Sequence, residues 1–174
     1  MAPTDTIAAE IFERHHVAVF RFFRRLTGRP DVAEDLTQEV FLRVVKGVEQ
    51  YRVMGRETGW LFQIARRVLI DHHRQRSDTT VSLSDTDPDQ AAAPPAQLVA
   101  FGLQEAVSRL PNAERAAFLL REVGGLTYGE IADVCDTTED AVSARLYRAR
   151  ARLRQLLSTR LAFLRGPRNQ QGTL

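Results

Sequence analysis

A segment near the middle of the chain divides it into two parts of similar length. Residues 77–97 contain Pro88, Pro94 and Pro95, four acidic residues and no basic residue. The segment has no sustained apolar period of 2 or 3.6, and it cannot bury enough apolar surface to offset the entropy of ordering. We therefore expect a flexible acidic linker between two small folded units.

Apolar residues on both sides of this linker recur at helical spacing. The pattern predicts helices over residues 7–26, from about 31 to 48, 58–76, 98–109 and 112–123, followed by a pair of helices between 126 and 156. No strand-like alternation of useful length is present. We expect an all-α fold in two small helical modules, 1–76 and 98–165, with the linker at 77–97 and a disordered tail at 166–174.

Each helix of the first module is predicted to bury one apolar stripe. The stripes are Ile11, Ala18, Val19, Phe22 and Leu26; Val32, Leu36, Val40, Val44 and Val48; and Leu61, Ile64, Ala65, Val68 and His72. Asp31 is the expected N-cap of the second helix, with Glu34 as its capping-box partner. The residues from Tyr51 to Gly59 are expected to form a loop.

A helix-turn-helix pattern follows the linker. Gly124 and Gly125 are expected to end the preceding helix, because glycine accepts a left-handed C-cap at least cost. The caps expected in the pair are Thr127 with Glu130 for the first helix and Thr137 with Asp140 for the second. Two short helices joined by three or four residues, the second strongly basic, are typical of DNA-binding proteins.

Charge is distributed unevenly over the second module. Residues 103–140 hold three arginines and eight acids, whereas residues 141–174 hold eight arginines and no acid. A one-signed block of this kind favours a polyanion as partner. The outward face of the last helix is predicted to bind DNA through Ser143, Arg145, Tyr147, Arg148, Arg150 and Arg154. The alternative is a basic amphipathic helix for a membrane surface or an acidic protein.

Two further surfaces are predicted in the first module. The third helix turns Gln63, Arg66, Arg67, Ile70 and Arg74 outward, and Trp60 begins it. Aromatic rings beside cations suit unpaired bases, although Trp60 alone is more often a core residue. The solvent side of the second helix carries Asp35, Gln38, Glu39, Leu42 and Lys46, which suggests a protein interface or a solvated surface.

The sequence gives little support for an enzyme function. The adjacent pairs His15–His16 and His72–His73 point about 100° apart on a helix, so neither pair converges on a metal. Catalytic and phosphate-binding signatures are absent, and we predict no enzyme activity, metal or cofactor. The lone Cys135 excludes an internal disulfide and fits a reduced, cytoplasmic setting. No apolar run is long enough for membrane insertion, and the N-terminus does not resemble a secretory signal.

Three groups of motifs, in this order, resemble the sigma-70 family, specifically its extracytoplasmic-function (ECF) sigma factors. Residues 31–42 (DVAEDLTQEVFL) are similar to the core-binding segment of region 2, and residues 60–71 (WLFQIARRVLID) to the promoter-melting helix. Leu110-Pro111, residues 126–132 (LTYGEIA) and residues 145–150 (RLYRAR) are similar to region 4. The resemblance covers about residues 10–157.

The resemblance implies core RNA polymerase, promoter DNA and an anti-sigma factor as partners. The clamp helices of the β′ subunit would contact Asp35, Gln38, Glu39 and Leu42. The melted minus-ten element would lie near Tyr51, Arg56, Trp60, Gln63, Arg66, Arg67 and Arg74. The helix-turn-helix would read the minus-thirty-five element and contact the β flap.

The predicted linker is long enough for this arrangement. Its length of 21 residues allows a reach of at most about 70 Å. Promoter elements one and a half duplex turns apart are separated by about 55 Å. As a random coil the linker would span only about 25 Å, so it would be extended on polymerase.

Two other functions stay open from sequence alone. A stand-alone helix-turn-helix regulator would bind duplex DNA without polymerase, and would normally carry a dimer interface or ligand domain, neither of which the sequence reveals. A polymerase-binding regulator such as an anti-sigma decoy would keep the strip on the second helix and would not need Arg145.

Overall fold

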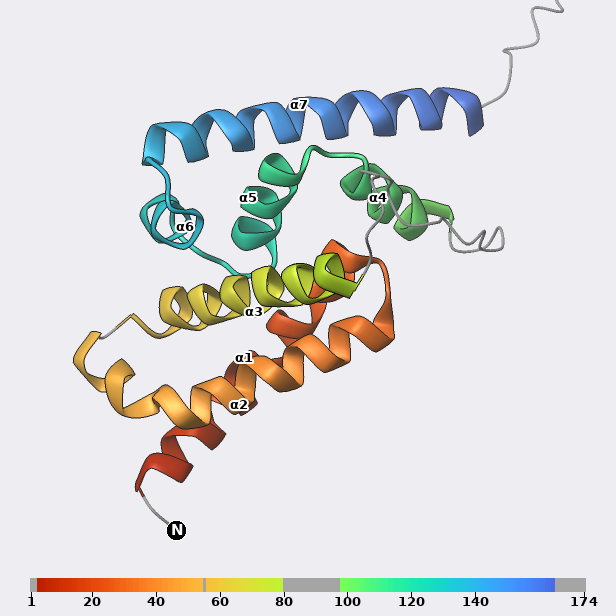
Figure 1. Ribbon diagram of the computed structural model, residues 1–174. Helices are drawn as coiled ribbons and strands as arrows, with labels where there is room; N and C mark the ends of the chain where they lie inside the picture. Colours follow the sequence, from red (N-terminus) through yellow and green to blue (C-terminus); the bar gives the residue numbers. More distant parts are fainter. Residues whose placement is uncertain (1–2, 55, 80–97, 165–174) are drawn as a thin grey trace, which may run out of the picture.

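The fold is all-α in the part of the chain that the structure describes. The computed structural model describes residues 3–54, 56–79 and 98–164, with side chains over 6–48, 56–75 and 102–158. Within these ranges seven helices and no strand are present (Figure 1): α1 (Pro3–Thr27), α2 (Pro30–Met54), α3 (Glu57–Thr79), α4 (Leu98–Ser108), α5 (Asn112–Glu122), α6 (Tyr128–Cys135) and α7 (Glu139–Leu164). The predicted fold class is confirmed.

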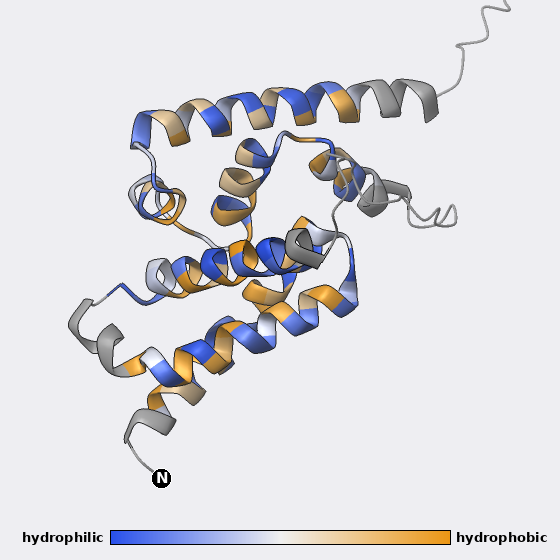
Figure 2. Ribbon diagram, viewed as in Figure 1, coloured by the Kyte–Doolittle hydropathy of each residue, from blue (hydrophilic) through white to orange (hydrophobic). Residues whose placement is uncertain are grey.

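The first module packs α1 against α2 and α2 against α3. The predicted stripes supply its core: Ile11, Val19, Phe22, Leu36, Val40, Val44, Val48, Leu61, Ile64, Ala65 and Val68 are buried. Figure 2 shows apolar residues recurring along α2 and α3 between polar ones. Polar contacts fix the register of α3. His15 Nε2 lies 2.6 Å from Glu57 Oε1, and Arg43 of α2 donates to Asp71 at 2.8 Å.

The second module holds α7 against α4, α5 and α6. Val142, Leu146, Ala149 and Leu153, spaced three or four residues apart, line the buried face of α7. Up to residue 158 most of the other positions of this helix are exposed, and in Figure 1 it forms one side of the molecule. The structure therefore presents the basic helix on a rigid support.

The two modules pack directly against each other. Helix α3 contacts α6, and α1 contacts α4 and α5. Phe62 of α3 is only 1% exposed, because its ring packs against Phe22 of α1 and lies at the turn before α6, where a Cβ on Gly124 would come within 3.1 Å of it. Gln104 Nε2 of α4 donates to the carbonyl of Arg25 at 3.3 Å. One continuous apolar core joins the two modules.

Local signals around the helix-turn-helix are confirmed with one correction. Thr127 and Glu130 form a reciprocal capping box on α6, and Gly125 has a φ of +70° after α5. The predicted cap at Thr137 is wrong by one residue, because Thr138 Oγ1 accepts from the amide of Ala141. The turn between the helices has three residues, 136–138, as expected, and the amide of Thr137 bonds to the carbonyl of Ala132.

Two predicted boundaries in the first module are also wrong. Helix α2 begins at Pro30, so Asp31 lies in its first turn and pairs with Arg29 instead of capping the helix. Proline suits a first helical position because the amide it lacks would have no helical partner there. The loop expected from Tyr51 to Gly59 is largely helical, because α2 continues to Met54 and α3 begins at Glu57.

The boundary between the first module and the predicted linker is shifted. Helix α3 runs to Thr79, three residues into the segment predicted as linker. Residues 80–97 and 165–174 lie outside the described residues, so the linker and the tail stay predictions. Among the described helices none is both long and apolar enough to cross a membrane.

Candidate nucleic-acid interface

Helix α7 presents most of the predicted DNA-binding side chains to solvent. Ser143, Tyr147, Arg148, Arg150 and Arg154 are exposed, with Tyr147 at 72%. Ser143, Arg150 and Arg154 flank the stripe through Leu146, whereas Tyr147 and Arg148 lie further round the helix. A ring and several guanidinium groups on one open helix can contact base edges and phosphates together.

Arg145 departs from the expected orientation. Its side chain is half-buried, near Cys135 of α6, because position 145 falls between the buried stripe and the exposed face of α7. The fully outward placement predicted for Arg145 is therefore wrong, whereas its role in DNA binding stays a prediction. Burial raises the pKa of the Cys135 thiol, and the positive charges of Arg145 and Arg66 oppose that rise.

Acidic residues of α5 hold three arginines of α7. Glu114 Oε1 accepts from Arg148 Nε at 3.1 Å, and Glu114 Oε2 lies 3.0 Å from Arg152 Nε. Glu122 accepts from Arg150 at 3.2 Å, which raises the pKa of Arg150. Sequence reasoning missed these acids, because the partners lie 28 to 38 positions apart.

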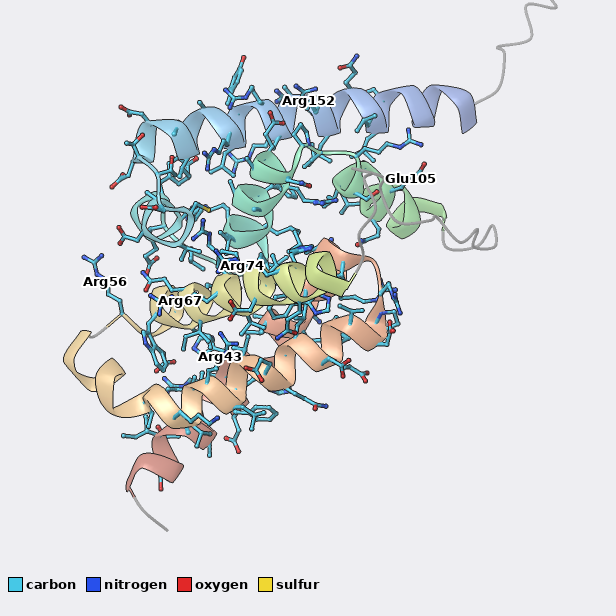
Figure 3. All side chains as sticks on the ribbon, in the orientation of Figure 1. Arg43, Arg56, Arg67, Arg74, Glu105 and Arg152 are labelled. Atoms are coloured by element: carbon cyan, nitrogen blue, oxygen red, sulfur yellow. The ribbon has the colours of Figure 1, made fainter. Side chains whose placement is uncertain are left out.

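The predicted strand-binding face of α3 is divided by the second module. Arg67, Ile70 and Arg74 are exposed, and Figure 3 shows Arg67 and Arg74 on α3. Gln63 and Arg66 are half-buried instead of fully outward, because α6 packs beside them. The structure thus brings only part of the predicted cationic surface into solvent.

Trp60 lies at the start of this face and is half-buried. A Cβ on Gly47 of α2 would lie 3.5 Å from its ring, so the indole packs against α2. Arg56 precedes α3 and is exposed. Tyr51 falls within α2, and its side chain lies outside the described residues.

A cleft of about 260 Å³ separates the beginning of α3 from α6. Its lining combines three of the predicted strand-binding residues with acids of the other module: Arg56, Gly59, Trp60, Gln63, Glu130 and Asp133. Arg56 pairs with Asp133 at 3.7 Å, and both side chains are well exposed. Two carboxylates of α6 therefore lie beside groups predicted to bind an unpaired DNA strand.

The predicted protein-binding strip on α2 is largely accessible. Asp35 and Gln38 are exposed, and Leu42 is 57% exposed. Glu39 is half-buried and accepts from Arg43 at 2.7 Å. Val45, 54% exposed and missed by the sequence reasoning, extends the apolar part of this strip. Its position one turn after Leu42 was the available signal.

Two family models match the two helical modules. A model of sigma-70 region 2 matches residues 11–79, and one of sigma-70 region 4 matches residues 101–153. The chain is 34% identical over 157 residues to the ECF RNA polymerase sigma factor SigE of Mycolicibacterium smegmatis, covering 86% of this chain and 61% of that relative. It is 32% identical over 152 residues to the ECF sigma factor SigM of Bacillus subtilis, covering 84% of this chain and 93% of SigM.

A solved structure has the same fold. The sigma factor RpoE from Bartonella quintana, determined in complex with the anti-sigma factor NepR, superposes with a TM-score of 0.69 at 24% identity, covering 86% of this chain and 96% of RpoE. The chain belongs to the sigma-70 family, among its ECF RNA polymerase sigma factors.

Proposed function

We propose that this chain binds core RNA polymerase and directs it to specific promoters. In this proposal residues 1–76 bind polymerase and the melted minus-ten element, and residues 98–165 bind the minus-thirty-five element and the β flap. The observation that carries it is the presence of cationic faces on α3 and α7, in two modules that match regions 2 and 4.

Promoter binding requires the two modules to separate. Only α6, a helix about 10–12 Å across, lies between the start of α3 and the start of α7 (Figure 1). The two promoter elements are about 55 Å apart, well beyond that spacing. Separation would also remove Glu130 and Asp133 from the strand-binding face. The predicted linker is long enough to allow this movement.

Polymerase binding is assigned to Asp35, Gln38, Glu39 and Leu42, to which we add Val45. Two exposed apolar side chains flanked by polar and acidic groups form a compact surface for another protein. The strip lies on α2, outside the α3–α6 contact. The chain can therefore meet polymerase before the modules separate.

Run-off transcription with purified core polymerase tests the function directly. We expect the chain alone to give core polymerase a promoter-specific product on a genomic template library. Gel shifts with and without core enzyme separate this function from that of a stand-alone regulator, which would bind duplex tightly without polymerase. Absence of any promoter-specific product would remove the proposal.

Replacing Arg145 tests base reading by α7. We expect Arg145→Ala to cost about 1–3 kcal/mol in promoter binding and to relax the preference at one upstream base pair. Arg154→Ala, further along the helix, is the matched control and should weaken all duplexes alike. The measurement is the affinity for duplexes that each carry one base-pair change. Unchanged preference in Arg145→Ala would refute a reading role.

The remaining proposals follow from the same function. We infer that an anti-sigma factor binds the chain, supported by RpoE, a protein of the same fold that was solved with NepR. We further infer that the chain has no catalytic chemistry of its own and works in the cytoplasm, where polymerase and DNA are found.

A further inference from the structure

Glu114 is an unusual residue for its position in the fold. Its side chain is the one acidic or basic group classed as buried among the described residues, with 5% of the residue exposed. Removing a carboxylate from water costs several kcal/mol unless close partners compensate. Glu114 lies in the first turn of α5, on the side that faces α7.

The partners of Glu114 are two arginines spaced one turn apart on α7. Arg148 Nε donates to Oε1 at 3.1 Å, whereas Arg152 Nε makes an ion pair with Oε2 at 3.0 Å without hydrogen-bond geometry. The side chains of Arg148 and Arg152 are 52% and 54% exposed, although Glu114 is buried. Figure 3 shows Arg152 on α7, above α5.

This geometry engages the inner edge of each guanidinium group. A guanidinium has five N–H donors in a planar fork, and Nε carries only one of them. With each Nε within 3.1 Å of Glu114, the remaining donors are available on the outer part of each group. A free arginine would lose rotamer entropy on binding DNA, and a preorganised arginine loses less.

We propose that Glu114 is a positioning residue for the minus-thirty-five element, acting through the guanidinium groups of Arg148 and Arg152. The proposal rests on the proposed function and adds a residue that does not itself contact DNA. A buried acid next to a DNA-binding face opposes binding through its charge. Glu114 therefore contributes by orienting the two guanidinium groups. Its loss should change the preference for particular DNA sequences and not the general affinity for DNA.

Glu114→Gln in the full-length chain tests this, because glutamine keeps the shape and removes the charge. We expect the affinity for the preferred upstream duplex to fall about tenfold, while the affinity for unrelated duplex stays the same or rises. Glu122→Gln is the matched control. It makes the same charge change on the same helix, but the Glu122–Arg150 pair is about half exposed, and we expect a change of twofold or less in the same ratio.

A double-mutant cycle tests whether Glu114 changes sequence preference through Arg148 and Arg152. Glu114→Gln should cause no further loss of preference in an Arg148→Ala, Arg152→Ala background. An equal loss in that background would overturn the proposal. So would a lower melting temperature with an unchanged preference, because Glu114 would then serve the fold alone.

A measurement without DNA separates this proposal from the function on which it rests. In ¹⁵N spectra of the free chain, the Nε–H signal of Arg148 should exchange slowly with water and lose that protection in Glu114→Gln. Failure of the wild-type chain in run-off transcription would refute the proposed function and leave this result standing. Rapid exchange in the wild-type chain would refute the positioning role, whatever the transcription result.

Discussion

Oxidation of a Gly59→Cys, Glu130→Cys pair is expected to abolish promoter-specific transcription, and reduction to restore it. A Cβ built on Gly59 lies 3.8 Å from the Cβ of Glu130, which is the usual separation across a disulfide. The bond would hold α3 against α6 and keep the modules together. Cys135→Ala in the same chain removes the competing thiol.

The control for this experiment is internal. Loss of Glu130 from the capping box costs about 1 kcal/mol, but the oxidised and reduced forms carry the same loss. Each single cysteine variant should be insensitive to oxidant. The oxidised chain should still bind core polymerase, because the α2 strip lies outside the α3–α6 contact. Equal run-off transcription before and after reduction would show that separation of the modules is not required.

Leu42→Arg is expected to weaken binding to core polymerase about 30-fold. Hot-spot residues in protein interfaces contribute about 2 kcal/mol or more, and Leu42 is the most exposed apolar side chain of the α2 strip. In the complex with polymerase, an arginine at position 42 would lose its contact with water and gain no oppositely charged partner. Because Leu42 is 57% exposed, the free energy of unfolding should change little.

Val17→Arg is the matched control for Leu42. Val17 is also an exposed apolar residue, at 45%, but it lies on α1. It is five positions from Phe12, the α1 residue whose ring packs against Phe41 of α2, and so it projects from a different face of α1. A titration of labelled core polymerase measures both variants. Equal losses in the two variants would remove the assignment of the α2 strip.

The parts of the fold that local sequence encodes were predictable. A capping box needs two residues three apart, and a left-handed turn needs a glycine, so the pair Thr127 and Glu130 and the stop at Gly125 could be identified directly. The apolar stripes predicted the core of the first module for the same reason, since helical period relates close neighbours.

Contacts between distant segments were not predictable. Phe62 is not part of the apolar stripe predicted for residues 58–76, yet its ring is buried between Phe22 of α1 and the turn at Gly124 in the second module. The same contact makes Arg66 half-buried. No spacing within residues 58–76 indicates what will pack on that helix from residues 124–135.

The same distinction between local and distant contacts applies to the candidate nucleic-acid interface. The exposed positions on α7 follow from its own period, and only Arg145 departs from the expected face. Its acidic supports on α5 depend on the packing of α5 against α7. A sequence can therefore reveal which arginines α7 offers, whereas the groups that hold them require the three-dimensional structure.

The burial of Phe62 also affects the chain before it meets any partner. Drawing α3 away from the turn at Gly124 would expose the part of this ring that Phe22 does not cover, at a cost below the roughly 1.5–3 kcal/mol of a whole side chain. The free chain should therefore favour the arrangement in which the two modules stay in contact. Any partner that holds the two modules apart must offset this cost through its own contacts.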